Sequence, residues 1–93
     1  MELPTEMYRN YVTRREDDLN QLTVALKILD VSVFRRVGHQ LRGNATSFGF
    51  NELLNLANDL HEVNTENISQ TGPRIISQLQ TWIVENKKKY DLA

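Results

Sequence analysis

Side chains of apolar character recur along this chain at steps of three and four residues, in four separate stretches. That spacing places them on one face of an α-helix, so each stretch predicts an amphipathic helix. The first two stripes, with one arginine among them, are Tyr8, Tyr11, Arg15, Leu19, Leu22, Leu26 and Leu29, and then Phe34, Val37, Leu41, Ala45 and Phe48. The last two are Phe50, Leu53, Leu54, Ala57, Leu60 and Val63, and then Ile75, Ile76, Leu79, Trp82, Ile83 and Tyr90. The alternation with a period of two that marks a half-buried strand is not sustained anywhere.

The first two helices have recognisable ends. We expect the first to run from about Pro4 to Leu29, since proline suits a first helical turn. Asp30 and Ser32 then offer side-chain caps for the second helix. Gly49 should end that helix, because glycine adopts the left-handed backbone conformation of a helix C-terminus without strain.

The third and fourth helices are separated by the polar segment 64–67, which reads as a connection. Gly72-Pro73 is expected to break the chain, with Pro73 in the first turn of the last helix and Ile68 in the turn before it. Each apolar stripe must bury against the others to be stable in water. The sequence therefore predicts an all-α fold, an antiparallel four-helix bundle of up-down-up-down topology, with residues 1–93 as a single domain.

Composition and charge narrow the class of protein. The chain is 40% apolar and 25% charged, the balance of a globular domain. It has no cysteine, which excludes disulfides and thiolate metal clusters. A formal net charge of −1 argues against nucleic-acid binding, which usually needs a basic excess. The short run Lys87–Lys89 is better explained as the basic last turn of a helix, where cations complement the helix dipole.

No membrane association is expected from the sequence. The longest apolar runs, such as Val24–Leu26, are far too short to span a bilayer. The segment Met1–Pro4 lacks the basic and then apolar pattern of a signal peptide. We therefore expect a cytoplasmic protein, and the start at Met1 weakly favours a free-standing chain over a segment of a larger kinase.

His39 is the main candidate for chemistry. At about 100° per residue it falls away from the apolar stripe of the second helix, so it should face solvent or the edge of the bundle. Arg35 and Arg42 lie one turn to either side of it, and Gly43 leaves bare backbone on the same side. Gly38 immediately precedes it, and two glycines beside an exposed histidine suggest close approach by a partner.

This arrangement suits phosphoryl chemistry. Histidine titrates near neutral pH, so its neutral, nucleophilic form is available in the cell. Guanidinium groups stabilise a phosphorylated product through charge-assisted hydrogen bonds. From the spacing alone, a surface histidine with incidental arginines is the favoured interpretation.

The residues from His39 to Gly43, His-Gln-Leu-Arg-Gly, resemble the signature of histidine-containing phosphotransfer (HPt) domains. Those domains read His-x-Leu-Lys-Gly, followed by small residues, a further glycine and a leucine-rich helix. In this chain Gly49 follows ten residues after the histidine, and the segment 50–60 continues in the same pattern. The specific resemblance covers about a third of the chain, residues 34–63, and its residue types, spacing and helix placement agree.

The resemblance implies that His39 is phosphorylated, on Nε2, by the aspartyl phosphate of one receiver domain and passes the group to another. Arg42 would replace the usual lysine in stabilising the phosphate, and Gly43 would give the receiver access. The partners would be receiver domains of response regulators or hybrid histidine kinases. The chain would have no turnover of its own and no bound cofactor, because the receiver supplies the carboxylates and Mg²⁺.

Departures from the family pattern fall beside the histidine. Arg42 is bulkier and more directional than lysine. Asn44 replaces a usually small residue, and Gly38 replaces a residue that is more often alanine. His61 lies where related domains place a polar side chain that hydrogen-bonds the active histidine, so His61 is a candidate orienting partner for His39. A half-buried histidine bonded elsewhere is the alternative explanation of His61. A metal site formed by His39 and His61 is not favoured, because two ligands fall short of the usual four.

A rival interpretation is a helical docking module that binds receiver domains or partner helices without phosphate chemistry. His39 separates the two, because a pure docking module needs no ionisable nucleophile at that position. A hydrolase is less favoured, since a small bundle with one exposed histidine offers no cleft with converging groups.

Overall fold

The four predicted helices are present in the structure, a computed structural model that describes residues 3–92. They are α1 (Thr5–Lys27), α2 (Val31–Phe48), α3 (Leu53–His61) and α4 (Ile68–Lys89). Within residues 3–92 there is no β-strand. The all-α fold class is confirmed.

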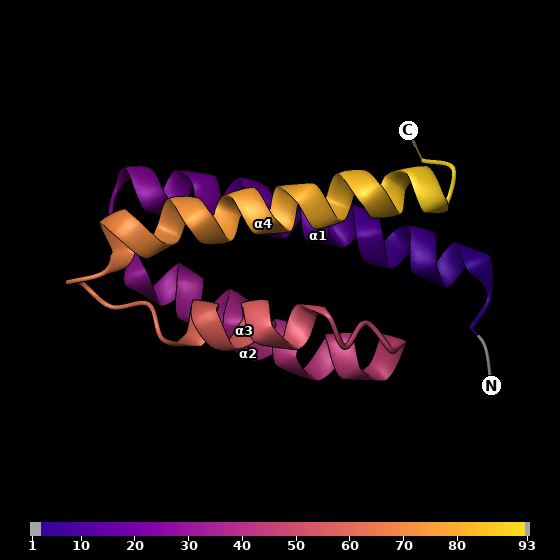
Figure 1. The fold of residues 1–93 in the computed structure, drawn as a ribbon, viewed down its shortest axis with the longest axis horizontal. Helices are drawn as coiled ribbons and strands as arrows, with labels where there is room; N and C mark the ends of the chain where they lie inside the picture. Colours follow the sequence, from indigo (N-terminus) through magenta and orange to yellow (C-terminus); the bar gives the residue numbers. More distant parts are fainter. Residues whose placement is uncertain (1–2, 93) are drawn as a thin grey trace.

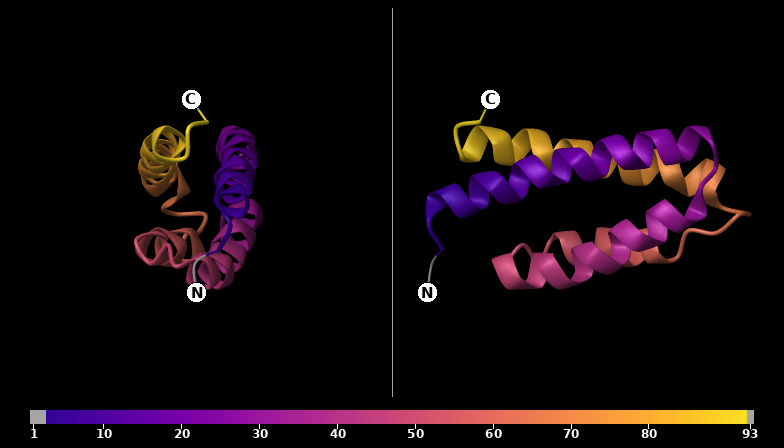
Figure 2. Two further views of the ribbon diagram at one scale, coloured as in Figure 1. Left: turned by 90° about the vertical axis from the view of Figure 1, so that its right-hand side faces the viewer. Right: turned by 180° about the vertical axis from the view of Figure 1, so that it is seen from behind.

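The helices form an antiparallel bundle in which each helix returns alongside the one before it. In Figure 1, α1 and α4 lie side by side above α2 and α3, and both chain termini are at the same end. Seen along its length in Figure 2, the molecule has one helix near each corner. Contacts join α1 to α2, α2 to α3, α3 to α4, and α4 back to α1. This is the up-down-up-down arrangement expected for short connections.

The core is built from the predicted stripes. Each helix contributes fully buried side chains to it. They are Leu22 from α1, Phe34 and Leu41 from α2, Leu60 from α3 and Leu79 from α4. Burial of such side chains, at about 1.5–3 kcal/mol each, drives the four faces together. No helix among the described residues is long and apolar enough to cross a membrane.

The edges of the predicted stripes need correction. Leu29 is 54% exposed and lies beyond the end of α1, with a φ of 56°. Phe48, Leu54 and Ile76 are only half-buried, whereas Val12, which the stripe left out, is completely buried. The buried face of these helices is therefore slightly rotated about the helix axis from the face that the three- and four-residue spacing predicts. The reason is that helices pack at an angle to each other.

The ends of α2 follow the predicted chemistry. The Asp30 carboxylate accepts hydrogen bonds from the backbone N–H of Ser32, at 3.1 Å, and from its hydroxyl, at 2.6 Å. At the other end Gly49 adopts the left-handed conformation, with a φ of 77°. The Gly49 and Phe50 N–H groups then donate to the carbonyls of Thr46, at 3.2 Å, and Ala45, at 2.9 Å. These bonds satisfy carbonyls that a helix end leaves without partners.

Replacing Asp30 with alanine should lower the melting temperature, because the first turn of α2 loses its side-chain acceptor. The hydrogen bonds from Ser32 hold the pKa of Asp30 below its usual value. The cap therefore contributes stability above the unfolded-state pKa and loses it as the pH falls through the lower folded-state pKa. Thermal melts at neutral and strongly acidic pH would measure this. The Asp30→Asn variant should keep the cap without the pH dependence, and a melt of Asp30→Ala identical to wild type would contradict the capping role.

The predicted break at Gly72-Pro73 is wrong. Helix α4 begins at Ile68, so Pro73 is its sixth residue rather than part of its first turn. Ile68 and Gly72 are buried, and a Cβ on Gly72 would lie 2.8 Å from Leu26 Cδ1. Burial of this first turn against α1 stabilises a helix that local propensity disfavours. Proline removes the donor that would pair with the Ser69 carbonyl, but Ser69 is exposed, so water can replace that bond.

Candidate functional site

His39 lies on the exposed side of α2, as its angular position predicted. The neighbouring positions Val37 and Leu41 are buried at 1% exposure each, so the stripe and the histidine point to different sides of the helix. Within residues 3–92 no side-chain hydrogen bond engages the His39 ring. A ring in this position is open to a partner that approaches from solvent.

The two arginines flanking His39 both reach across to the next helix or its end. Arg35 Nε donates to the Val63 carbonyl, at 2.9 Å, and Arg42 Nη2 donates to Asn58 Oδ1, at 2.7 Å. Since each guanidinium carries five N–H donors, these contacts hold the group in place and leave further donors for an anion. Both positive charges are therefore fixed on the α3 side of His39.

The third arginine of this helix, Arg36, contacts α1 instead of α3. Arg36 Nη2 donates to Gln21 Oε1 of α1, at 2.7 Å. Arg36 thus belongs to the contact between α1 and α2 rather than to the surroundings of His39.

Gly43, one turn after His39, is open. A Cβ built on Gly43 meets no atom within 4 Å, and the residue is exposed. Nothing inside the protein therefore requires glycine at this position, while glycine in a helix costs about 1 kcal/mol relative to alanine. The bare backbone patch predicted beside His39 is present.

The interpretation of Gly38 needs correction. Gly38 is buried, and a Cβ there would lie 2.8 Å from the His61 backbone nitrogen, 2.8 Å from Leu60 Cβ and 2.9 Å from the Ala57 carbonyl oxygen. Gly38 therefore lets α2 and α3 approach closely, and it does not serve a partner from outside. Only the glycine after the histidine faces solvent.

His61 is exposed at the C-terminal end of α3, and its backbone lies against Gly38, the residue before His39. The close packing of α2 on α3 thus brings the two histidine-bearing segments together. No hydrogen bond joins the two imidazole rings among the described residues, and no cluster of three or more potential metal ligands occurs there. The role of His61 as an orienting partner stays a prediction.

Asn44 belongs to a polar cluster that the sequence did not reveal. Its Oδ1 accepts hydrogen bonds from Tyr11 Oη, at 2.7 Å, and from Arg15 Nη1, at 3.1 Å. Arg15 is 6% exposed, and its Nε lies 2.9 Å from Asp18 Oδ2. Burial raises the pKa of Asp18, and the charge of Arg15 opposes that effect. Asn44 therefore ties α2 to α1.

Sequence reasoning missed the partners of the arginines as well as this cluster. Asn58 and the Val63 carbonyl could not be singled out, because each acts only through a contact across two helices. A helical wheel gives the direction of Arg35 and Arg42 from α2 but not the rotation of α3 against it.

Comparison of this chain with protein-family models, with curated proteins and with solved structures finds no match in any of the three.

Proposed function

We propose that this domain is a phosphocarrier of a multistep phosphorelay, in which His39 accepts a phosphoryl group from the aspartate of one receiver domain and passes it to another. The observation that carries the proposal is the combination of an exposed imidazole, two flanking guanidinium groups held by Asn58 of α3 and by the Val63 carbonyl just after it, and open backbone at Gly43. The resemblance of residues 39–43 to the HPt signature supports it.

In the transfer step, the lone pair of neutral His39 Nε2 attacks the phosphorus of the aspartyl phosphate. A P–N bond forms as the P–O bond to the receiver breaks, and the electron pair of that bond leaves with the receiver's carboxylate. The reverse sequence on a second receiver regenerates the free histidine. Because the phosphoryl group needs mainly alignment and charge neutralisation, an exposed histidine with fixed cations beside it is sufficient on this side of the reaction.

Arg42 stabilises the phosphorylated histidine through charge-assisted hydrogen bonds, with Arg35 contributing positive charge from the other side. Asn58 restricts Arg42 to one side of the histidine through the 2.7 Å bond. Since arginine is more directional than lysine, this restriction compensates for the departure from the family pattern. His61 is the candidate that orients the His39 ring in the complex.

The receiver would supply the acidic residues and the Mg²⁺ ion, and the carrier would have no turnover or cofactor of its own. The partners would be receiver domains of response regulators or hybrid histidine kinases, with neither nucleic acid nor membrane involved. Such a relay operates in the cytoplasm, which is where we expect this chain.

The experiment is incubation of the chain with a receiver domain that carries radioactive phosphate on its aspartate. The label should move to the chain and be lost in acid but retained in alkali, as a phosphorus–nitrogen bond requires. A stable complex with the receiver but no transferred label would instead favour the docking module. Arg42→Gln should slow transfer more than Arg36→Gln, because only Arg42 lies on the histidine's side of the bundle.

Two substitutions at Gly43 test receiver access. Gly43→Glu should block transfer far more than Gly43→Ala, because its long, negative side chain obstructs the receiver and repels its acidic site. Both should preserve stability or raise it by up to about 1 kcal/mol, since both replace a helical glycine. Transfer rates and melting temperatures of the two variants provide the comparison. Transfer by Gly43→Glu at the wild-type rate would mean that no receiver docks beside Gly43.

A further inference from the structure

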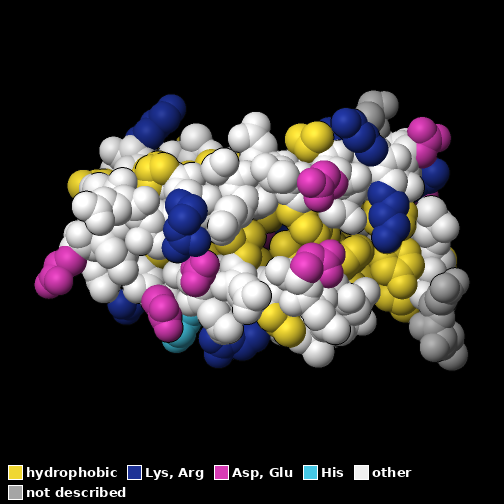
Figure 3. All heavy atoms as spheres, in the orientation of Figure 1, with side chains coloured by type: hydrophobic (Ala, Val, Ile, Leu, Met, Phe, Trp, Pro, Cys, Tyr) yellow, Lys and Arg dark blue, Asp and Glu magenta, His cyan; other side chains and the backbone are white. Residues whose placement is uncertain are grey.

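A concave site lies on a different face of the bundle from His39, between α3 and α4. Its apolar floor is formed by Leu53, Leu56 and Trp82, and its volume is about 300 Å³. In Figure 3 it is visible near the centre of the molecule as a hollow with hydrophobic side chains at its base. None of the residues that line it belongs to the surroundings of His39. The pocket is therefore independent of the proposed phosphotransfer site.

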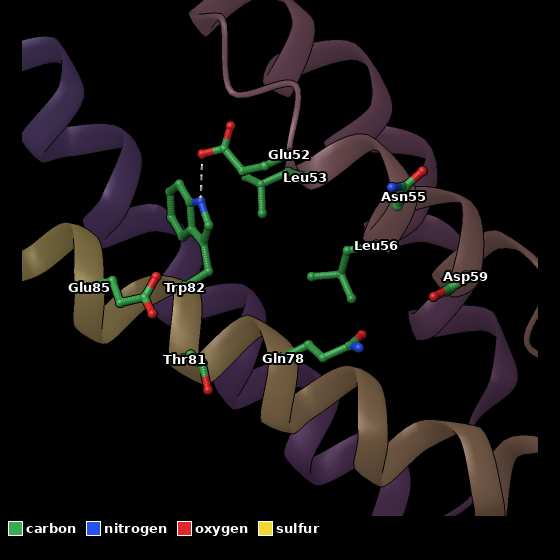
Figure 4. A pocket seen from close by; sticks show the side chains of 9 residues that line it. All are labelled: Glu52, Leu53, Asn55, Leu56, Asp59, Gln78, Thr81, Trp82 and Glu85. Atoms are coloured by element: carbon green, nitrogen blue, oxygen red, sulfur yellow. Dashed lines mark hydrogen bonds between the residues drawn. The ribbon is translucent and has the colours of Figure 1, made fainter.

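Carboxylates surround this apolar floor. Glu52 and Asp59 come from the α3 side and Glu85 from α4, and Figure 4 shows them at the margin of the pocket. No lysine, arginine or histidine is among the lining residues. Three like charges around a low-dielectric surface focus a negative potential into the space between them.

Only one of these carboxylates forms an ion pair within the described residues. Asp59 Oδ2 pairs with Arg74 Nη1 at 3.1 Å. Glu52 Oε2 accepts a hydrogen bond from Trp82 Nε1, at 3.1 Å, but that donor is uncharged. Among the described residues no ion pair involves Glu52 or Glu85. The Trp82 end of the pocket thus has two carboxylates beside an indole ring, and neither forms an ion pair among the described residues.

This combination matches one kind of side chain. Lysine and arginine cover apolar surface with their methylene stems while the cationic end stays at a polar margin. A cation near an indole face gains a cation–π interaction as well as attraction to the carboxylates. About 300 Å³ is at the small end of ligand pockets, so the site suits one long side chain better than a large organic ligand.

We propose that this pocket seats a lysine or arginine side chain from a basic amphipathic segment of a protein partner. The aliphatic stem lies on Leu53 and Leu56, and the cation lies between Glu52, Glu85 and the Trp82 ring. The segment's apolar side chains then cover the remainder of the groove between α3 and α4. Because the lining residues do not overlap the His39 site, the carrier can hold this partner and a receiver on separate faces.

The test uses the full chain and a fluorescein-labelled, tryptophan-free amphipathic helical peptide of lysine, leucine and alanine. Anisotropy measures the affinity. The emission of Trp82, the chain's only tryptophan, reports whether the peptide reaches the pocket. We expect saturable binding, a shift in Trp82 emission, and a loss of affinity of about tenfold or more in the double variant Glu52→Gln/Glu85→Gln, since two charge contacts are lost. Glutamine at position 52 keeps the acceptor for the indole, so thermal stability should be unchanged.

The matched control is Glu62→Gln/Glu66→Gln, which removes the same charge at exposed positions outside the pocket. This control should bind the peptide nearly as well as wild type. Equal losses in the two double variants would overturn the proposal by showing general charge attraction, and so would an unchanged Trp82 emission at saturation. Tight binding of spermine that displaces the peptide would also overturn it, because the occupant would then be a small polyamine. None of these outcomes depends on phosphorylation of His39.

Discussion

Replacing Gly38 with alanine should destabilise the protein by about 1–3 kcal/mol, although alanine is the better helix former. The added Cβ would lie within 2.9 Å of the His61 nitrogen, Leu60 Cβ and the Ala57 carbonyl oxygen. Two of those atoms belong to the backbone of α3, so the clash is relieved only by moving one helix against the other. Chemical denaturation with a linear extrapolation would measure the change, and a loss of 1 kcal/mol should lower the melting temperature by roughly 4–8 °C.

The matched control is the same substitution at Gly43, on the same helix but facing solvent. A Cβ there meets nothing within 4 Å, so Gly43→Ala should raise stability by up to about 1 kcal/mol. Opposite signs at the two positions are the expected result. If both variants were stabilised, α2 and α3 would not pack as closely at Gly38 as the structure has them, and the nearby arrangement of His39 and His61 would be wrong as well.

The four helices and their order could be predicted, because the apolar pattern that indicates each helix is local and repeats along the chain. Each stripe recurs over several turns, and the cap at Asp30 and the left-handed turn at Gly49 depend only on neighbouring residues. The start of α4 could not be predicted in the same way. Tertiary burial of Ile68 and Gly72 outweighs the local preference of Pro73 for a first turn, and that burial is invisible in the sequence.

The candidate site shows the same difference between features set by one helix and features set by the packing of two helices. The exposure of His39 and the openness beside Gly43 follow from angular position on one helix, and both are present. The bond from Arg42 to Asn58 depends on how α2 and α3 meet, and a single helix cannot give it. The prediction for Gly38 was wrong for that reason. A sequence does not distinguish a glycine that admits a binding partner from one that lets a neighbouring helix pack closely.

Replacing His39 with glutamine should abolish phosphate acceptance while changing stability by less than about 0.5 kcal/mol, as is typical of exposed positions. Glutamine keeps a polar side chain on the same face of α2 but has no nucleophilic ring nitrogen. Transfer from a phosphorylated receiver and thermal melting of the same preparation would give the two results. A variant that lost transfer because it unfolded would be recognised by its melt.

The control is His61→Gln, which removes the other histidine of the chain. It should still accept phosphate, at a reduced rate if His61 orients the ring of His39. Complete loss of phosphate acceptance in His61→Gln together with normal acceptance in His39→Gln would show that the nucleophile is His61, at the end of α3, and not His39.

The most direct measurement is phosphorus NMR of the chain after exposure to a phosphorylated receiver, with wild type, His39→Gln and His61→Gln compared under alkaline conditions. The proposed function predicts one phosphohistidine resonance in wild type and in His61→Gln, and none in His39→Gln. A phosphohistidine resonance that persists in His39→Gln, or that is absent from wild type with every receiver that binds the chain, would contradict it.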